Sequence, residues 1–290
     1  MRWKDLRRSE NVRDVRGEEG GGGMRAGMPI SLGRGGALAG VAVLVVAYLL
    51  GGPEAVENLL EGGGGGAPTA EQGSPLTAND EASQFVAAIL GSTEDVWTEI
   101  FASSGRRYEA PELTLFDGAV QSACGYATAA VGPFYCPSDR RVYLDTAFFA
   151  DLARLGGPGD FAQAYVIGHE VGHHVQNLLG TAAKVRAAQG GAGEAGGNPL
   201  QVALELQADC FAGVWAHHAN QRNHVLEPGD VEEGLAAAEA IGDDRLQHNA
   251  GRRVTPDSFT HGSSEQREHW LKAGLDSGDP NACDTFRGTR

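Results

Sequence analysis

The stretch from Ala164 to Gln176, AYVIGHEVGHHVQ, decides the fold of this chain. It contains His169, Glu170 and His173 in the pattern HExxH. On a helix, residues four apart lie on the same face, so both imidazoles can reach one metal ion. Glu170 follows the first histidine directly, where its carboxylate can act as a general base on a metal-bound water. The pattern therefore predicts a buried helix with a metal site near its middle.

HExxH also arises by chance, and alone it is equally consistent with an amphipathic helix that carries two solvated histidines. The apolar residues Val166, Ile167 and Val175 around the motif favour a buried helix. Asp160 is a suitable N-cap for this helix and Gly180 a suitable C-cap. A third metal ligand is needed to decide between the two interpretations.

The third ligand is expected from a later helix at residues 198–219, NPLQVALELQADCFAGVWAHHA. A metzincin needs a glycine and a histidine where Gln176 and Leu179 stand, so this class is excluded. A gluzincin instead takes a glutamate from a later helix, and Glu205 meets this need. Unpaired buried carboxylates are costly, so Asp209 is expected to accept the N–H of a ligating histidine. The alternative is that both acids are solvated on a polar face.

Composition limits the number of domains and the kinds of partner. The chain has 290 residues and 41% hydrophobic content, enough for one good-sized core. Its net charge is −15, although residues 1–36 hold eight basic and five acidic residues. The acidic excess therefore lies in the remainder, which would repel phosphates, and a nucleic-acid partner is excluded.

Residues 37–52, ALAGVAVLVVAYLLGG, carry no charge and are predicted to be a single transmembrane signal-anchor. A cleaved signal peptide is the alternative, but the preceding 36 residues are long for such a segment. The basic residues 1–36 are then expected to stay in the cytoplasm of a bacterial cell. Residues 53–76, rich in Gly and Pro, are predicted to be a flexible linker. Residues 77–290 would form the extracytoplasmic domain.

Two helices are predicted before the strands, one from Thr77 and a second that restarts at Ser92. Residues 113–116 and 141–145 alternate apolar and polar side chains and are predicted strands. Within the second run, residues 142–144 are either an edge strand that aligns a peptide by strand addition or a plain core strand.

The chain has four cysteines, and an even number in an exported domain indicates disulfides. We expect Cys124 to pair with Cys136 and Cys210 to pair with Cys283. A zinc site made of four cysteines is the competing interpretation. Such sites usually need CxxC-like spacing, which these cysteines lack.

Six segments resemble the bacterial membrane-anchored "putative neutral zinc metallopeptidase" family. They lie within residues 1–16 and 77–290 and read MRWKDLRRSENV, SACGYATAAVGPFYCPSDRRVYLD, GDFAQAYVIGHEVGHHVQNLLG, LELQADCFAGVWAHHAN, LEPGDVEEGLAAAEAIGDDRLQ and PDSFTHGSSEQR. The resemblance implies a mainly helical, zincin-like α+β metalloprotease domain with a small β-sheet. It also implies one Zn²⁺ held by His169, His173 and Glu205, with Glu170 as catalytic base. Gly168 departs from the alanine expected before the motif and is expected to loosen the helix slightly.

These features predict a membrane-anchored zinc-dependent endopeptidase that acts on a protein or peptide. A zinc-activated water would attack the peptide bond, with Glu170 as general base. The oxyanion needs a further donor, for which His261 is the candidate, supported by the cation of Arg267. Tyr165 is less favoured, because it can simply pack in the core. The alternative function is a zinc-stabilised or metal-free envelope module that binds peptidoglycan or a partner protein. Glu170 counts against it, since a structural metal site needs no base.

Overall fold

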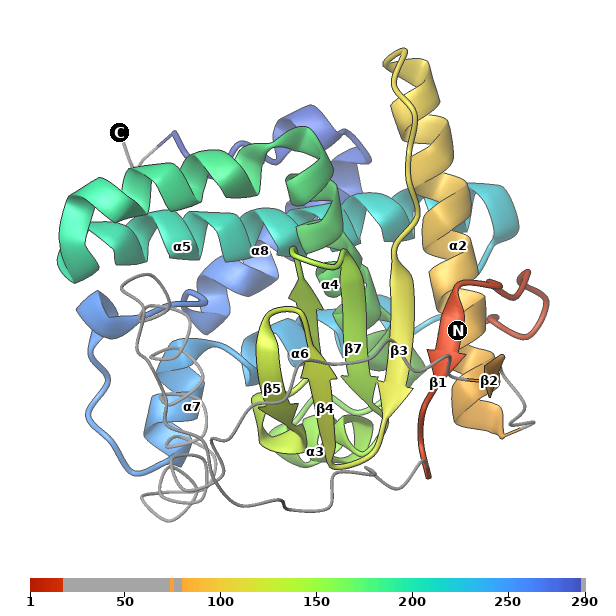
Figure 1. Cartoon of the computed structure of the whole chain (residues 1–290), viewed down its shortest axis with the longest axis horizontal. Coiled ribbons are helices and arrows are strands. Elements are labelled where there is room, and N and C mark those ends of the chain that lie inside the picture. The colour runs from red at the N-terminus through yellow and green to blue at the C-terminus, as the bar shows by residue number, and fades with distance from the viewer. Residues whose placement is uncertain (18–73, 76–79, 288–290) are drawn as a thin grey trace, which may run out of the picture.

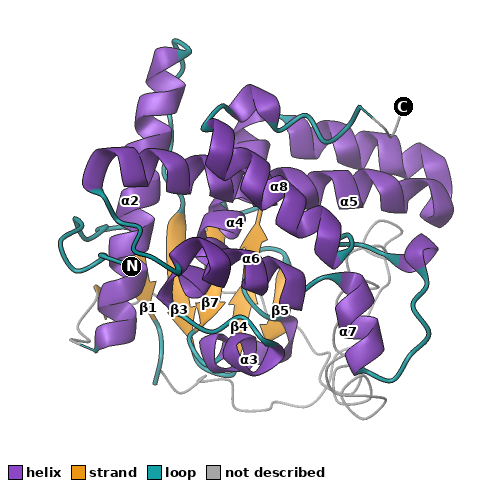
Figure 2. Ribbon diagram, turned by 180° about the vertical axis from the view of Figure 1, so that it is seen from behind, coloured by secondary structure: helices purple, strands orange, loops and turns teal. Residues whose placement is uncertain are grey.

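The structure is a computed structural model that describes residues 1–17, 74–75 and 80–287. It confirms a mixed α+β fold that is mainly helical, with small sheets. The strands are β1 (Val12–Asp14), β2 (Ser74–Pro75), β3 (Glu112–Phe116), β4 (Ala119–Ser122), β5 (Gly125–Thr128), β6 (Phe134–Cys136) and β7 (Arg141–Asp145). The helices are α2 (Glu81–Ser103), α3 (Phe148–Leu155), α4 (Asp160–Leu179), α5 (Thr181–Asn223), α6 (Asp230–Ala240), α7 (Asp243–Asn249) and α8 (Ser264–Ser277). Helices gather behind the sheet in Figure 1 and in front of it in Figure 2.

The main sheet has the strand order β2-β1-β3-β7-β6, and β4 and β5 form a separate antiparallel hairpin. Strands β1, β3 and β7 run parallel, whereas β2 and β6 are antiparallel to their neighbours. Strand β7 lies between β3 and β6. Of the two interpretations of residues 142–144, the core strand is therefore confirmed and the edge strand is wrong.

Helix α2 is one continuous helix rather than the two that were predicted. Asp80 caps it, and its side chain accepts a hydrogen bond from the Ser83 amide. The predicted break at Ser92 does not occur, because the polar side chains there find partners. Thr93 Oγ1 donates to the Leu90 carbonyl at 2.7 Å, and Ser92 Oγ accepts from Trp215 Nε1 at 3.1 Å. Hydroxyl groups that can start a helix are thus accommodated inside one.

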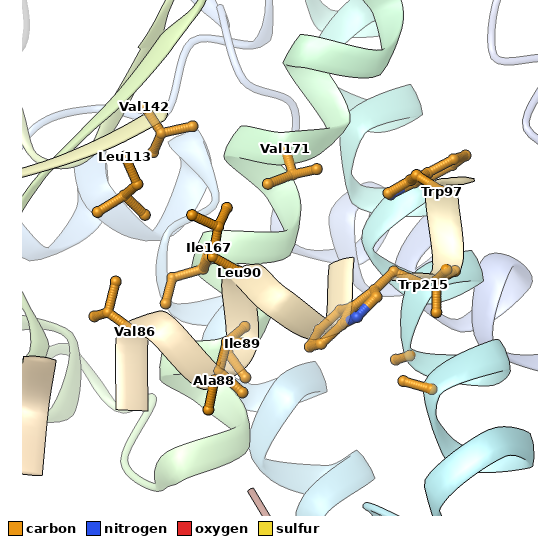
Figure 3. Close-up of a cluster of buried hydrophobic side chains, with 14 of the residues drawn as sticks. Val86, Ala88, Ile89, Leu90, Trp97, Leu113, Val142, Ile167, Val171 and Trp215 are labelled. Atoms are coloured by element: carbon orange, nitrogen blue, oxygen red, sulfur yellow. The ribbon is translucent and has the colours of Figure 1, made fainter. Parts of the chain in front are cut away.

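The main core lies between α2, α4, α5 and the sheet (Figure 3). Apolar side chains of α2 pack against the buried face of α4. They also pack against apolar side chains of strands β3 and β7. Those drawn in Figure 3 include Val86, Ile89, Leu90, Leu113, Val142, Ile167, Val171 and Trp215. Helix α4 is therefore buried along most of its length, as the apolar flanks of HExxH predicted.

Helices α4 and α5 approach closely at two glycines. A Cβ on Gly168 would lie 2.9 Å from the indole ring of Trp215. A Cβ on Gly172 would lie 2.9 Å from the Ala208 carbonyl oxygen. Gly168 was expected only to loosen its helix, but the structure shows that the absence of a side chain admits Trp215. These contacts set the distance between the two helices.

Helix α5 is helical from Thr181 to Asn223, but the chain turns within it, so that its second part runs back beside the first (Figure 1). Gln189 Nε2 donates to Gln201 Oε1 at 3.3 Å, although a straight helix would separate them by about 18 Å.

Both predicted disulfides are present. Cys124 is bonded to Cys136, and Cys210 is bonded to Cys283. The second ties the C-terminal residues to the part of α5 that carries Glu205.

The first 17 residues belong to the same folded body as the rest of the described chain. Strand β1 pairs in parallel with β3, and the Ser9 amide donates to the Ala87 carbonyl at 2.8 Å. Trp3, Leu6 and Val12 are buried in the main core. The prediction of a separate segment at 1–36 is therefore wrong for residues 1–17.

The predicted transmembrane segment, residues 37–52, lies outside the described residues, as does the linker at 53–76 except for β2. Among the helices that the structure describes, none combines the length and the apolar character that crossing a bilayer requires.

Candidate metal centre

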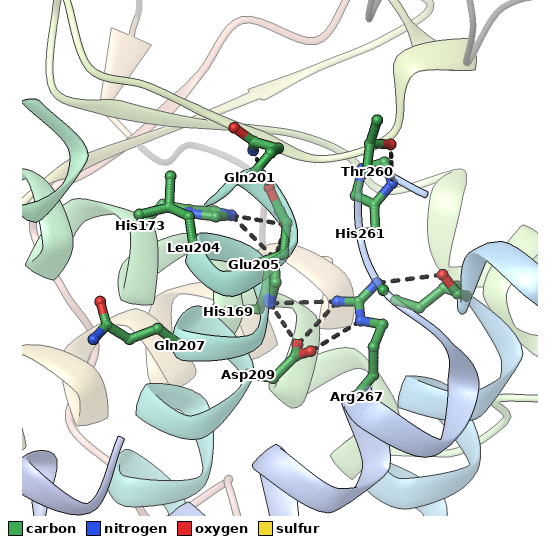
Figure 4. Close-up of polar contacts among 12 residues, drawn as sticks. His169, His173, Gln201, Leu204, Glu205, Gln207, Asp209, Thr260, His261 and Arg267 are labelled. Atoms are coloured by element: carbon green, nitrogen blue, oxygen red, sulfur yellow. Dashed lines mark hydrogen bonds and ion pairs between the residues drawn. The ribbon is translucent and has the colours of Figure 1, made fainter. Parts of the chain in front are cut away.

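Helices α4 and α5 bring three potential ligands together (Figure 4). The one-turn spacing of His169 and His173 places their Nε2 atoms 3.1 Å apart. Glu205 reaches across from α5, and its Oε2 lies 3.3 Å from each of these nitrogens. The three residues form a group whose ligand atoms all lie within 4.8 Å of one another. The structure therefore assembles the set predicted from the sequence.

The spacing of these three atoms suits a tetrahedral metal ion. Zinc binds histidine nitrogen and carboxylate oxygen at about 2.0–2.1 Å, which places two tetrahedral ligands about 3.3–3.4 Å apart. The observed separations of 3.1, 3.3 and 3.3 Å are close to this value. The donor set of two imidazoles and one carboxylate also fits zinc. One ion can thus contact all three residues with little rearrangement.

Each candidate ligand contacts a neighbouring side chain through one of its two polar side-chain atoms. The other atom is then free to bind the metal. His169 Nδ1 lies 2.7 Å from Asp209 Oδ1, and His173 Nδ1 lies 3.0 Å from Gln176 Oε1. Gln201 Nε2 donates to Glu205 Oε1 at 2.9 Å. Such contacts fix the tautomer of a ligating histidine and the direction of its ring. The predicted role of Asp209 agrees with this geometry.

Asp209 is fully buried and sits at the centre of a charged network. The Arg267 guanidinium donates to both of its oxygens at 2.9 Å, and the Tyr165 hydroxyl donates at 2.6 Å. Burial alone would raise the pKa of Asp209, but Arg267 and His169 lower it to about 2. Asp209 therefore stays ionised against His169. Arg267 pairs with this carboxylate, and its support of the oxyanion stays a prediction.

Glu170 lies buried beside the two histidines. Burial raises the pKa of its carboxyl, the nearby imidazoles lower it, and the charge of Glu205 raises it again, with a net upward shift. A general base works best when its pKa lies near the operating pH. The environment of Glu170 therefore suits the role predicted for it.

His261 approaches the centre from the segment before α8 (Figure 4). Its Nδ1 lies 3.2 Å from Asp243 Oδ1, and its backbone amide donates to Asp243 Oδ2 at 2.7 Å. Burial lowers the pKa of His261, while Asp243 and the charge of Glu205 raise it, and the net pKa is raised. The effect of the Glu205 charge on this pKa shows that the His261 ring lies near the centre.

Histidine 174, next to the motif, has a structural role. His174 Nε2 lies 2.6 Å from the Glu109 carbonyl, and its Nδ1 lies 3.0 Å from the Tyr135 hydroxyl. Burial lowers the pKa of His174 to about 4, so the ring is neutral. Both ring nitrogens of His174 thus contact groups outside α4.

Sequence reasoning missed four residues that support the centre. Gln176 and Gln201 were not assigned to the site. Gln176 lies three residues after His173, and Gln201 lies four residues before Glu205. Tyr165 was assigned to the core and lies four residues before His169. Residues at these spacings share a helix face, so the signal was present. Asp243 had no such signal, because it reaches His261 only through tertiary packing.

The comparisons with known proteins agree with this geometry. The family described as "Putative neutral zinc metallopeptidase" matches residues 1–286. The uncharacterized protein YpfJ of Escherichia coli (strain K12) is 48% identical over 291 residues, which cover 99% of each chain. The uncharacterized protein Rv2575 of Mycobacterium tuberculosis (strain ATCC 25618 / H37Rv) is 46% identical over 212 residues, or 69% of each chain. No solved structure matches the chain.

The metal-free protein is expected to release protons when it binds Zn²⁺ at pH 7. Burial lowers the pKa of His169, but Asp209 and Glu205 raise it to about 10, and Glu205 likewise raises the pKa of His173. Protonated rings must lose their protons before Nε2 can bind a metal. The apparent affinity should therefore rise with pH between the ordinary histidine pKa and about 10.

Isothermal titration calorimetry in buffers of different ionisation enthalpy measures this proton release. Asp209→Asn is the control, because loss of its charge lowers the pKa of His169 and should reduce the number of protons released. A binding heat that does not depend on the buffer would contradict the expectation.

Proposed function

The chain belongs to the "putative neutral zinc metallopeptidase" family, and on that basis we propose that it is a zinc-dependent endopeptidase that hydrolyses peptide bonds within proteins or peptides. One observation carries the proposal. Three ligand atoms stand at tetrahedral spacing, and the buried carboxyl of Glu170 accompanies them on the helix that bears the two histidines.

The number of ligands favours a catalytic centre over the structural metal site of a binding module. Structural zinc sites usually have four protein ligands, whereas catalytic sites have three and keep one position open. Among the described residues, the group at this centre contains His169, His173 and Glu205 and no fourth member. A buried general base beside an open position has a use in hydrolysis and none in a structural site.

Zinc, when bound, supplies a Lewis acid that polarises the scissile carbonyl and makes a water acidic near neutral pH. Glu170 would take a proton from the attacking water and pass it to the departing amine. Because the pKa of Glu170 is raised, its carboxyl group can accept a proton from the water and donate it to the amine at more similar free-energy costs. Asp209 keeps the Nδ1 proton of His169 in place, and Gln176 fixes the ring of His173.

His261 is proposed to stabilise the oxyanion that forms when the carbonyl is attacked. Asp243 accepts from the backbone amides of Thr260, His261 and Gly262, at 2.7, 2.7 and 3.1 Å. These three bonds hold the turn that carries the imidazole. The raised pKa of His261 favours the charged form of its ring, in which both nitrogens carry a proton to donate.

Three variants are expected to give three different combinations of zinc content and peptidase activity. Glu205→Ala removes a ligand, so both zinc and activity should be largely lost. Glu170→Gln should keep zinc but lose hydrolysis, because this residue acts on the water. Asp209→Asn should lower metal affinity or activity by about 10–100-fold. Metal analysis and a mixed peptide library measure the two quantities.

Glu265→Gln, on the exposed side of α8, is the control for these variants and should change neither quantity. Full zinc and activity in Glu205→Ala would place the third ligand elsewhere and overturn the proposed centre.

Loss of the His261 imidazole should lower the turnover rate without loss of zinc. His261→Gln is expected to reduce kcat by about 10²–10³-fold, the usual cost of removing one oxyanion donor. Asp243→Asn should reduce kcat less, because it leaves the imidazole present but less well held. A change in KM or zinc content with an unaltered kcat would show that His261 has another role.

We also propose that the body lies outside the cytoplasm, attached to the membrane through residues 37–52. The support is the pair of disulfides, which persist in oxidising compartments and are rare in the cytosol. Because residues 1–17 share a sheet with the rest of the body, both flanks of the proposed anchor lie on the same side.

Protease added to cells stripped of their outer layers should remove antibody epitopes in residues 1–17 and in the body together. Protein isolated from such cells under alkylating conditions should contain both disulfides. Protection of residues 1–17 alone would indicate a single membrane span, and free thiols would indicate a cytosolic body.

A further inference from the structure

A series of hydrogen bonds between amide side chains leads from His173 away from the metal centre. His173 Nδ1 lies 3.0 Å from Gln176 Oε1, and Gln176 Nε2 lies 3.3 Å from Gln207 Oε1. Gln207 Nε2 then donates to the Cys283 carbonyl at 2.9 Å. In Figure 4, Gln207 lies on the same side of the centre as His173. Because Cys283 is bonded to Cys210, the series joins a candidate metal ligand to a disulfide.

The direction of each bond in this series is set by two backbone carbonyls, which can only accept hydrogen bonds. The Leu204 carbonyl accepts from one end of the Gln176 amide at 2.6 Å, so this end is the NH₂ group and the other end is the oxygen. The Cys283 carbonyl orients the Gln207 amide in the same way. The Gln176 oxygen therefore needs a donor from His173. The proton of the neutral ring is placed on Nδ1, and Nε2 is left for a metal.

Burial makes this arrangement of Gln176 strongly preferred. Its side chain is fully buried, and a buried amide costs free energy unless its polar atoms are hydrogen-bonded. One N–H meets the Leu204 carbonyl, the other faces Gln207 Oε1, and the oxygen faces His173. A rotated amide would instead set its oxygen against the Leu204 carbonyl. A fully satisfied network of this kind favours one arrangement of its members.

Gln176 also connects the two helices that carry the ligands. It belongs to α4, whereas Leu204 directly precedes Glu205 on α5. One side chain therefore orients a ligand of α4 and contacts the backbone of α5 beside the third ligand.

The acceptor at the far end of the series is fixed in place by the segment around it. The Cys283 amide donates to the Pro280 carbonyl at 3.2 Å. The Thr285 hydroxyl donates to the Ala203 carbonyl of α5. Together with the disulfide to Cys210, these bonds fasten residues 280–285 along α5. The Cys283 carbonyl is thus a stationary acceptor for Gln207.

We propose that Gln207 and the Cys283 carbonyl are positioning groups for His173, which act through Gln176, and that the Cys210–Cys283 disulfide thereby raises the metal affinity of the centre. The inference rests on the proposed function only for the identity of the ligands. Neither Gln207 nor Cys283 contacts a ligand atom, so their effect passes through Gln176. The alternative is that both groups stabilise the fold and leave metal affinity unchanged.

The first test measures the zinc dissociation constant of the full chain by competition with a chelator. Methionine is similar in length to glutamine and cannot form these bonds. Gln176→Met should weaken zinc binding by about 10–100-fold, as expected for the partner of a ligand. Gln207→Met should weaken it by about 2–10-fold, the value of one neutral hydrogen bond. Gln221→Met is the matched control, because this exposed amide of α5 bonds to His217 away from the centre and should not matter.

A double variant tests whether Gln207 acts through Gln176. If it does, Gln207→Met should have almost no further effect on zinc affinity once Gln176 is replaced by methionine. Effects that multiply in the double variant would show that the two residues act independently, and would overturn the proposal. Unchanged affinity in Gln207→Met alone would overturn it too.

The second test removes each disulfide in turn. Replacement of Cys210 and Cys283 by alanine should weaken zinc binding about as much as Gln207→Met, and the two changes should not multiply. Replacement of Cys124 and Cys136 by alanine is the matched control. It should lower the midpoint of thermal unfolding but leave zinc affinity unchanged. An equal loss of zinc affinity in both forms would indicate general destabilisation and overturn the proposal.

Nuclear magnetic resonance of the histidine rings supplies a readout that fold stability alone would not change. In the zinc-loaded full chain, the Nδ1 proton of His173 should exchange with water slowly. The exchange should be faster in Gln176→Met and Gln207→Met, whereas Gln221→Met should match the original chain. Equal exchange rates in all four proteins would contradict a positioning role.

These measurements do not use peptidase activity. A chain that binds zinc and hydrolyses no peptide would contradict the proposed function and leave the positioning of His173 to be decided by the zinc affinities. Absence of zinc binding by the full chain would overturn the metal centre and this inference together.

Discussion

The close packing of α4 against α5 is the constraint on which the candidate centre depends. Two histidines one turn apart make a metal site only when a third ligand reaches them from elsewhere. Glu205 does so because Gly168 and Gly172 let α5 approach without a clash against Trp215 or the Ala208 carbonyl. The same approach brings Asp209 to the far nitrogen of His169. Small residues at a helix contact therefore determine ligand geometry here.

Charge balance in the buried region explains why a divalent cation fits there. The carboxylates of Glu170, Glu205 and Asp209 are all buried, and the buried guanidinium of Arg267 pairs with Asp209. With neutral histidines this leaves an excess of two negative charges if all three acids are ionised. Unpaired buried charge is costly, and without a metal it is relieved by protonation. The upward pKa shifts of His169, His173 and Glu170 are consistent with that response.

Several long-range contacts hold the two ligand-bearing helices in place. The disulfide between Cys210 and Cys283 fixes α5 one residue beyond Asp209. The α-ammonium of Met1 is paired with Asp160 at the start of α4. Parallel pairing of β1 with β3 adds the first residues of the chain to the sheet beside which these helices pack. The metal centre is thus supported by segments from both ends of the described chain.

The sequence by itself determined the parts of this protein that depend on local spacing. The shared face of the two histidines in HExxH and that of Glu205 and Asp209 follow from helical periodicity, which is a property of neighbouring residues. Gly180 ends the helix as predicted, whereas the predicted N-cap, Asp160, is its first helical residue and Gly159 is the N-cap. Only the tertiary structure decided the partners that come from distant segments. Arg267 meets Asp209 across 58 positions and Met1 meets Asp160 across 159, and no periodicity encodes such contacts. For the same reason, residues 1–17 were misassigned, because their basic composition was visible in the sequence but their place in the sheet was not.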